Sequence, residues 1–177
     1  MIRPHIVAIV GSKKSGKTTT VEGLIREFVK KKYKVGAVKH ISERDFTIDT
    51  QGKDTWRFAH VGATTVVSVS ANEVATVEKK SIDGFSIEEL LRKCDACDFV
   101  FTEGFKWLVG LEPNIQKIVV IKSEVEVENA LKIFDPILAF SGPCSTERVN
   151  KEIPYVNSVI EPEKLASIVE DFFQKRI

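Results

Sequence analysis

The chain has 177 residues, of which 26 are lysine or arginine and 25 are aspartate or glutamate, so its net charge is +1. This balance argues against broad binding to nucleic acid or to a membrane surface, and no apolar stretch approaches the roughly 20 residues of a membrane span. The length predicts a single domain over residues 1–177, with room for a substantial core.

The first predicted elements are a strand, a glycine loop and a helix. Residues 5–10 are a short apolar run of buried-strand length. Residues 11–18, GSKKSGKT, fit the phosphate-loop pattern G-x-x-x-x-G-K-[ST] at every fixed position. Apolar residues then recur with helical spacing along one face, at Val21, Leu24, Ile25, Phe28 and Val29. Because a strand precedes the loop and a helix follows it, the sequence predicts a nucleotide phosphate site.

The residue types of this loop fit that chemistry. Gly11 and Gly16 permit backbone approaches that a Cβ would block, and the loop N–H groups then point at phosphate oxygens. Lys17 is expected to reach the β- and γ-phosphates, and the Thr18 hydroxyl to ligate Mg²⁺. Lys13 and Lys14 either add charge to the site or are solvated side chains at a loop tip. Ser15 and Thr19 either contact phosphate or suit a helix start.

The next segments predict a second strand and then an insertion. Residues 34–39 read as a strand that is parallel to the first, because a helix connects the two. A polar loop follows over residues 41–52, in which residues 45–49 alternate weakly, as a short edge strand does. A short helix over residues 53–60 comes next. Residues 64–70 and 74–78 predict two strands joined by a hairpin turn.

The remainder alternates helices with strands. Ser86 and Glu89 form a capping box for a helix to about residue 93, and Pro162 starts a closing helix. The apolar runs are residues 99–102, 115–121 and 136–140, with a helix expected over 124–134. This order predicts an α/β fold of three layers, the phosphate-loop NTPase fold, with a mostly parallel sheet and a short β-hairpin insertion.

A carboxylate follows the strand at residues 99–102. Glu103 stands where a Walker B acid stands, and in a parallel sheet the carboxyl ends of all strands meet at one edge, beside the phosphate loop. We therefore expect Glu103 near the Mg²⁺ or the γ-phosphate, and Lys106 either pairs with it or faces the ligand. Cys94 and Cys97 have C-x-x-C spacing but close a helix, so we interpret them as structural cysteines.

Several motifs, taken in order over the first 106 residues, resemble one family. They are residues 11–19, Lys39-His40, Asp49, Gly52-Lys53-Asp54-Thr55, Gly62-Ala63 and Glu103-Gly104-Phe105-Lys106. This combination resembles the molybdopterin-guanine dinucleotide biosynthesis protein B (MobB) family. Residues 41–44, Ile-Ser-Glu-Arg, replace a histidine-rich stretch that often follows Lys-His in that family.

The resemblance implies a GTP-binding, weakly hydrolysing homodimer that uses Mg²⁺. It implies an accessory role in molybdenum cofactor maturation, with a MobA-like guanylyltransferase and the molybdopterin cofactor as partners. Carried over to this sequence, Lys17 and Glu103 are the catalytic candidates, and Thr18, Glu103 and Asp49 the metal candidates. The nucleotide-binding candidates are Gly11, Ser12, Lys13, Lys14, Ser15, Gly16, Lys17, Thr18, Thr19, Lys39, His40, Lys53 and Asp54.

Guanine specificity follows from the resemblance alone. The base-reading Asn-Lys-x-Asp motif is absent, and residues 150–153, Asn-Lys-Glu-Ile, lack its aspartate. Two alternatives remain open: a small-molecule kinase or ligase that uses ATP, and a nucleotide-gated binding module. A kinase normally carries an arginine-rich lid, whereas the arginines after the first helix are scattered. Residues 1–4 lead directly into the first strand and leave no room for a signal peptide, and three cysteines suit a reduced compartment, so we expect a cytoplasmic location.

Overall fold

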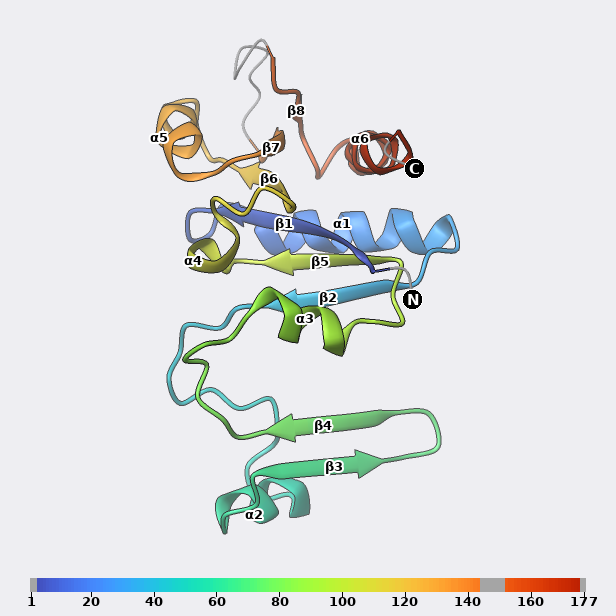
Figure 1. Ribbon diagram of the computed structural model, residues 1–177, viewed down its shortest axis with the longest axis vertical. Coiled ribbons are helices and arrows are strands. Elements are labelled where there is room, and N and C mark those ends of the chain that lie inside the picture. The colour runs from blue at the N-terminus through green and yellow to red at the C-terminus, as the bar shows by residue number, and fades with distance from the viewer. Residues whose placement is uncertain (1–2, 144–151, 176–177) are drawn as a thin grey trace. The chain divides into compact units, whose positions relative to one another are not determined.

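The computed structural model describes residues 3–143 and 152–175, which divide into two units (Figure 1). Unit 1 consists of residues 1–40 and 86–177, and unit 2 of residues 41–85. Cys144 and the Asn150-Lys151 pair of the near-match to a base-reading motif lie outside the described residues. No described helix has both the length and the apolar character that crossing a membrane requires.

Unit 1 is built on a six-stranded sheet in the order β2-β5-β1-β6-β7-β8, in which every pair is parallel. The strands are β1 (His5–Gly11), β2 (Val35–Lys39), β5 (Phe99–Glu103), β6 (Gln116–Val120), β7 (Ile137–Ser141) and β8 (Tyr155–Val156). In the central strand β1, residues 7–10 are fully buried, as expected of a strand covered on both faces. The predicted β1 and β2 are parallel, but β5 lies between them.

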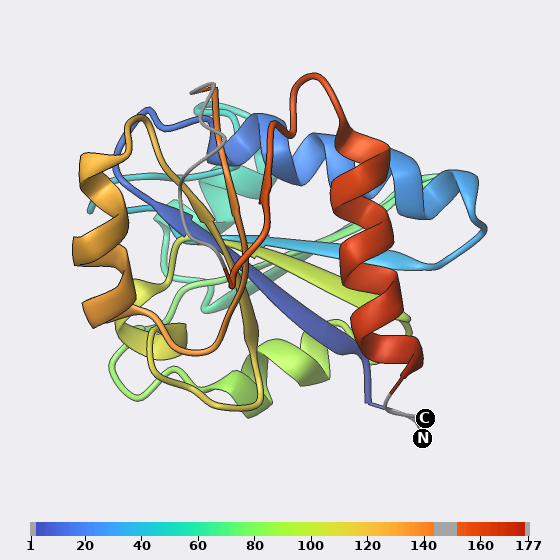
Figure 2. The same cartoon turned by 90° about the horizontal axis from the view of Figure 1, so that it is seen from above.

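Helices cover both faces of this sheet. Figure 2 shows α1 (Lys17–Lys30) and α6 (Pro162–Gln174) on one face, and α3 (Ile87–Lys93), α4 (Lys106–Val109) and α5 (Val125–Ile133) on the other. The core on the α1 and α6 side includes Leu24, Phe28 and Leu165, each at most 1% exposed. Phe28 meets Phe99 edge-on, with ring centroids 4.5 Å apart. This packing fixes α1, and with it the loop from which α1 emerges.

Unit 2 contains the helix α2 (Asp54–His60) and the antiparallel hairpin of β3 (Thr65–Val69) and β4 (Val74–Glu78). The hairpin register pairs Thr65 with Glu78 and Val69 with Val74, and the turn is closed by a hydrogen bond from the Ser70 N–H to the Glu73 carbonyl. Among its residues, all of which are described, Val66 alone is buried. Unit 2 is therefore held by backbone pairing more than by a core.

The three-layer, mostly parallel fold with a hairpin is confirmed, and so is the Ser86 half of the capping box, because the Ser86 hydroxyl accepts the Glu89 N–H at 3.3 Å. The edge strand expected over residues 45–49 is wrong. The Thr47 hydroxyl accepts the Asp49 N–H, and the Asp49 carboxylate accepts the Thr50 N–H. These side chains compete for the backbone donors that a strand would need. The sequence also missed α4 and β8, which have only four and two residues.

Candidate phosphate-binding site

The phosphate loop connects β1 to α1 at the carboxyl edge of the sheet. Gly11 has φ +148°, and a Cβ at this position would lie 2.2 Å from the Val120 carbonyl oxygen of β6. No residue with a side chain fits against β6 there, so the chain can turn into the loop only through glycine. Ser15 is buried, and its hydroxyl has no hydrogen-bond partner among the described residues. The loop thus carries an unsatisfied polar group, which a bound anion or water can satisfy.

Lys17, the first residue of α1, folds back across the loop, and its ammonium donates to the Ser12 carbonyl at 2.6 Å. Burial lowers the pKa of Lys17; the nearby Glu103 carboxylate opposes this shift, while Lys106, Lys39 and Lys122 add to it. Four lysines are therefore close enough to interact electrostatically around one loop. A group of cations at a helix N-terminus is suited to binding a polyanion.

A second group of atoms gathers beside the loop at Glu103. The Thr18 hydroxyl donates to Glu103 Oε2 at 3.0 Å, and the Lys39 ammonium lies 3.2 Å from the same oxygen and 3.4 Å from the Thr18 oxygen. The sheet register explains this meeting, because Lys39 and Glu103 are partners at the ends of the neighbouring strands β2 and β5. Glu103 therefore lies beside the phosphate loop, and its expected approach to Mg²⁺ or to a γ-phosphate stays a prediction.

The ends of β2 and β5 are joined beyond these side chains. The His40 N–H donates to the Glu103 carbonyl at 2.9 Å. Gly104 has φ +92°, and a Cβ there would lie 3.1 Å from the His40 Cβ, so the backbone conformation favours glycine and a larger residue would crowd His40. The His40 and Phe105 rings lie 5.3 Å apart. The Lys-His and Glu-Gly-Phe motifs, which are 64 positions apart in the sequence, thus contact each other at the ends of β2 and β5.

Two residues at the site were missed by the sequence reasoning. Glu126, in the first turn of α5, accepts the Ser12 hydroxyl at 3.0 Å through one carboxylate oxygen and the Lys122 N–H at 2.9 Å through the other. The Lys122 ammonium lies 3.5 Å from the Lys13 carbonyl. The loop after β6 therefore braces the phosphate loop. An acidic first turn after a central strand is the available signal, but it is also an ordinary helix start.

The other predicted residues are placed as follows. Lys13, Lys14 and Thr19 are exposed on the loop and the first turn of α1, and Lys106 makes no ion pair with Glu103 among the described residues, lying instead 6.0 Å from the Phe134 ring centroid. Asp49, Lys53 and Asp54 belong to unit 2. Asp54 pairs with Arg57 at 3.2 Å on the exposed side of α2, and Asp49 accepts hydrogen bonds from Thr50 and Thr55. Their part in the site remains a prediction.

The Thr18 and Glu103 oxygens fit a hard cation. Mg²⁺ prefers oxygen ligands and is typically held by one or two protein oxygens together with phosphate and water. The two oxygens lie 3.0 Å apart, and the neighbouring cationic group, Lys39, is close to both. In the described part of the chain, no three His, Cys, Asp or Glu side chains converge as a metal cage, so a metal here would depend on the phosphates as well.

The parallel sheet, the glycine loop leading into α1 and the carboxylate at the end of β5 define the class: a phosphate-loop protein of the α/β type. The chain belongs to the family described as molybdopterin guanine dinucleotide synthesis protein B, whose match covers residues 6–141.

Individual relatives agree with this family. The chain is 32% identical over 121 residues to a putative molybdopterin-guanine dinucleotide biosynthesis adapter protein of Methanocaldococcus jannaschii, and 32% identical over 122 residues to the adapter protein of Haemophilus influenzae. Both alignments cover 68% of this chain, but only 48% and 65% of those relatives. The chain thus matches about half to two thirds of the length of these two proteins.

Solved structures show the same fold. A crystal structure of molybdopterin-guanine biosynthesis protein B superposes with a TM-score of 0.72 at 25% identity, covering 96% of this chain and 99% of that one. The Bacillus subtilis MobB structure gives a TM-score of 0.68 at 20% identity, covering 92% and 96%. The fold therefore extends beyond residue 141, where the family match ends.

Proposed function

We propose that this chain binds GTP with Mg²⁺ at the phosphate loop and acts as an adapter in molybdopterin guanine dinucleotide biosynthesis. The observation that carries the proposal is that four lysines gather around the phosphate loop beside the hydrogen-bonded side chains of Thr18 and Glu103. Family membership supports the biosynthetic role, and two relatives are described as adapter proteins. Guanine, in place of another base, is supported by the family alone.

Each residue has a role in this proposal. Lys17 exchanges the Ser12 carbonyl for β- and γ-phosphate oxygens, while Gly11 to Thr19 supply backbone N–H groups and hydroxyls. Thr18 and Glu103 hold Mg²⁺, which when bound neutralises charge on the phosphates. Lys39 would then leave the two oxygens and pair with phosphate. Lys53, Asp54 and Asp49 are proposed to complete the nucleotide and metal contacts from unit 2.

Hydrolysis is expected to be slow. Among the described residues, no arginine or glutamine side chain makes a hydrogen bond or an ion pair with the phosphate loop. In other systems such a group accelerates phosphoryl transfer by about 10³–10⁵. A slow GTPase suits an adapter, whose bound nucleotide sets the state that a partner recognises. The proposed partners are a guanylyltransferase and the molybdopterin cofactor, and the proposed state is a cytoplasmic homodimer of one nucleotide-binding domain per chain.

Calorimetric titration with GTP and with ATP, each with Mg²⁺, tests the proposal. We expect GTP to bind more tightly, and Lys17→Ala to weaken it by at least about 100-fold, because the main phosphate cation is lost. Lys30→Ala, at the far end of the same helix, is the matched control and leaves affinity unchanged. A preference for ATP would favour the kinase alternative, and unchanged affinity in Lys17→Ala would refute the loop assignment.

Glu103→Gln separates metal binding from phosphate binding. The amide keeps the shape of the side chain but lacks the charge that Mg²⁺ favours. We expect Mg²⁺ to stimulate GTP binding and hydrolysis much less in this variant, while metal-free affinity changes little. Loss of metal-free affinity to the same extent would show that Glu103 shapes the loop and does not hold the cation.

A further inference from the structure

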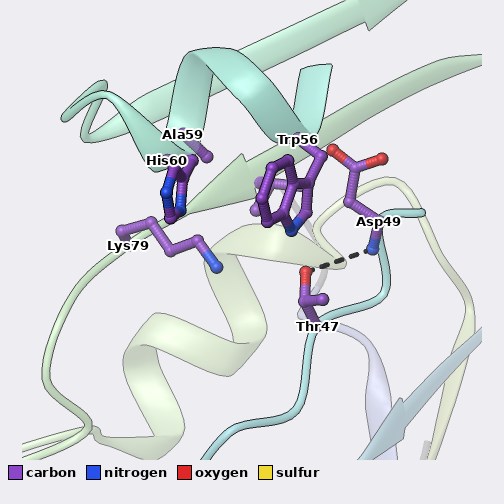
Figure 3. A pocket seen from close by; sticks show the side chains of 7 residues that line it. Thr47, Asp49, Trp56, Ala59, His60 and Lys79 are labelled. Atoms are coloured by element: carbon purple, nitrogen blue, oxygen red, sulfur yellow. Dashed lines mark hydrogen bonds between the residues drawn. The ribbon is translucent and has the colours of Figure 1, made fainter. Parts of the chain in front are cut away.

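Unit 2 contains a pocket of its own, with a volume of about 230 Å³, between α2, β4 and the segment before α2. We call it the Trp56 pocket. Figure 3 shows the side chains that surround it, all of them from residues 41–85. Those that carry the argument are Thr47, Asp49, Trp56, His60, Val77 and Lys79. The established family membership assigns no ligand to this pocket.

One wall of the Trp56 pocket is largely aromatic. The indole of Trp56 and the imidazole of His60, one helical turn apart on α2, are stacked with centroids 4.6 Å apart and planes 12° apart. Val77 contributes from β4. Two stacked rings fix each other's orientation, so this wall is preorganised for a flat, partly apolar ligand.

Three hydrogen-bond donors line the pocket, beside the imidazole of His60 and the carboxylate of Asp49. In Figure 3 the indole N–H of Trp56, the ammonium of Lys79 and the hydroxyl of Thr47 are directed toward the same space. The Thr47 oxygen accepts the Asp49 N–H at 3.2 Å, which leaves the hydroxyl hydrogen free to donate. In the described part of the chain, neither the indole N–H nor the Lys79 ammonium has a hydrogen-bond or ion-pair partner.

Asp49 is the one acid that lines this pocket, and its carboxylate is already engaged. Its Oδ1 accepts the Thr50 N–H at 2.8 Å and the Thr55 hydroxyl at 3.0 Å. In the view of Figure 3 the indole lies between this carboxylate and Lys79. The space beside Lys79 is therefore rich in donors, and it favours a ligand that presents acceptors.

We propose that the Trp56 pocket binds a fused oxo-heterocycle of the guanine or pterin kind through its acceptor edge. Guanine presents the neighbouring acceptors O6 and N7 on one edge, and a fully oxidised pterin ring presents the equivalent pair O4 and N5. Lys79 and the indole N–H supply the matching donors. The volume is below the roughly 300–1,000 Å³ of sites for larger ligands, so the pocket takes one ring system and not a whole dinucleotide.

This inference rests on the proposed function, because the product of that pathway contains both rings. It adds a second site, lined by residues of unit 2, that holds a heterocycle by its ring system and not by phosphates. The two sources of the same chemistry, a pterin and a guanine, are distinguished by experiment.

The experiment follows the indole N–H signal of Trp56 by ¹⁵N-resolved NMR in the full chain. Trp107→Phe removes the signal of the other tryptophan, and Lys17→Ala prevents binding at the phosphate loop. The probes are neopterin, guanosine, adenosine and inorganic phosphate, added separately. Lys79→Met tests the proposed donor, and Lys80→Met, the next residue along the chain and outside the pocket lining, is its matched control.

We expect the Trp56 indole signal to shift and to saturate as neopterin or guanosine is added. The ligand that binds more tightly identifies the source. Adenosine, whose N6 amino group is a donor where guanine has O6, should shift it little. Lys79→Met should weaken binding about tenfold and Lys80→Met should not. Equal shifts with adenosine, a shift with inorganic phosphate alone, or an unmoved signal would each overturn the proposal.

The two proposals fail separately. If the wild-type chain binds GTP while neopterin and guanosine leave Trp56 unmoved, the pocket proposal is wrong and the phosphate-loop proposal stands. If the Trp56 signal moves as expected but GTP does not bind the wild-type chain, the phosphate-loop proposal fails and the pocket stands as a separate heterocycle site. A dispersed spectrum of Lys79→Met verifies that this exposed substitution leaves the fold intact.

Discussion

Unit 1 and unit 2 are stabilised in different ways. Unit 1 has a parallel sheet buried between helices, with strand residues such as Val7 and Val100 fully inaccessible. Unit 2 has a two-stranded hairpin and a seven-residue helix, and Val66 is its one buried residue. A lone hairpin is marginally stable in water at best. Geometry at the phosphate loop is therefore held by a core, whereas geometry in the Trp56 pocket depends on ring stacking and short-range hydrogen bonds.

The largest expected contrast comes from truncating one phenylalanine in each unit. Phe28 is fully buried, whereas Phe58 on α2 is 57% exposed. Phe28→Ala should lower the free energy of unfolding by about 3–5 kcal/mol because it leaves a cavity, and Phe58→Ala by about 0.5 kcal/mol or less. Urea unfolding measures both. A large loss in Phe58→Ala would show that this side chain is covered in solution, for instance by a second copy.

The next effect concerns Lys117, a fully buried lysine of β6 in unit 1. Its ammonium donates to the Glu112 and Asp135 carbonyls at 2.6 and 2.5 Å. Burial nevertheless lowers the pKa of Lys117 from 10.5 to about 8, while Asp135 and Glu112 oppose the shift. Between these values the unfolded chain binds more protons than the folded chain, so stability should rise as the pH increases from about 8 to 10.5.

Lys117→Met tests this dependence through the pH slope and not through absolute stability, which also reflects the two lost hydrogen bonds. The slope in the wild-type chain should amount to roughly 2–3 kcal/mol over that range, and the variant should lack it. Equal slopes in both proteins would mean that Lys117 stays charged in the fold. Unit 2, all of whose residues are described, has no buried charged residue. We therefore expect it to contribute no comparable pH dependence of stability.

Hydrogen exchange compares the two units in the unmodified protein. The amides of β3 and β4 should open with a free energy about 2 kcal/mol or more below that of β1, β5 and β6, because little apolar surface holds the hairpin closed. Mass spectrometry of peptides from residues 64–79 and 99–104 measures this difference. Equal protection in the two peptides would show that the units unfold together.

The smallest effect is expected at Ser86, the first residue of unit 1 after the insertion. Its hydroxyl accepts the Glu89 N–H at the start of α3. Ser86→Ala should cost about 1 kcal/mol, and Ser86→Asp should retain most of the stability. Thermal unfolding of the two variants measures the cap. If both variants lose the same stability, the capping bond is not what Ser86 contributes.

The strongest sequence signals were those that local chemistry dictates. The glycine loop, the helix after it and the Ser86 cap are each encoded by residues that lie close together in the sequence. The position of Glu103 beside the phosphate loop could be expected because parallel strands end at one edge, a rule that needs no coordinates. The strand expected over residues 45–49 was wrong because Thr47 and Asp49 bind their own backbone, and alternation alone does not reveal this.

Other features depend on pairs that are distant in sequence. Glu126 braces Ser12 over 114 positions, and nothing near Glu126 distinguishes it from any acid in a first helical turn. Lys117 is, with Gln116, one of two polar residues in an apolar run, although the fold buries it against two carbonyls. The Trp56 pocket lies between α2 and β4. The sequence predicted the hairpin that contains β4, but not how this hairpin packs against the helix.

The sequence by itself determined the phosphate loop, the alternation of strands and helices, and the family, because each rests on short-range patterns in a fixed order. Tertiary structure decided that β5 lies between β1 and β2, which places Lys39 beside Glu103 and Thr18. It also decided the division into a unit with a buried core and a hairpin unit without one. The physical reason is that strand order and burial depend on the packing of distant segments, which no local pattern records.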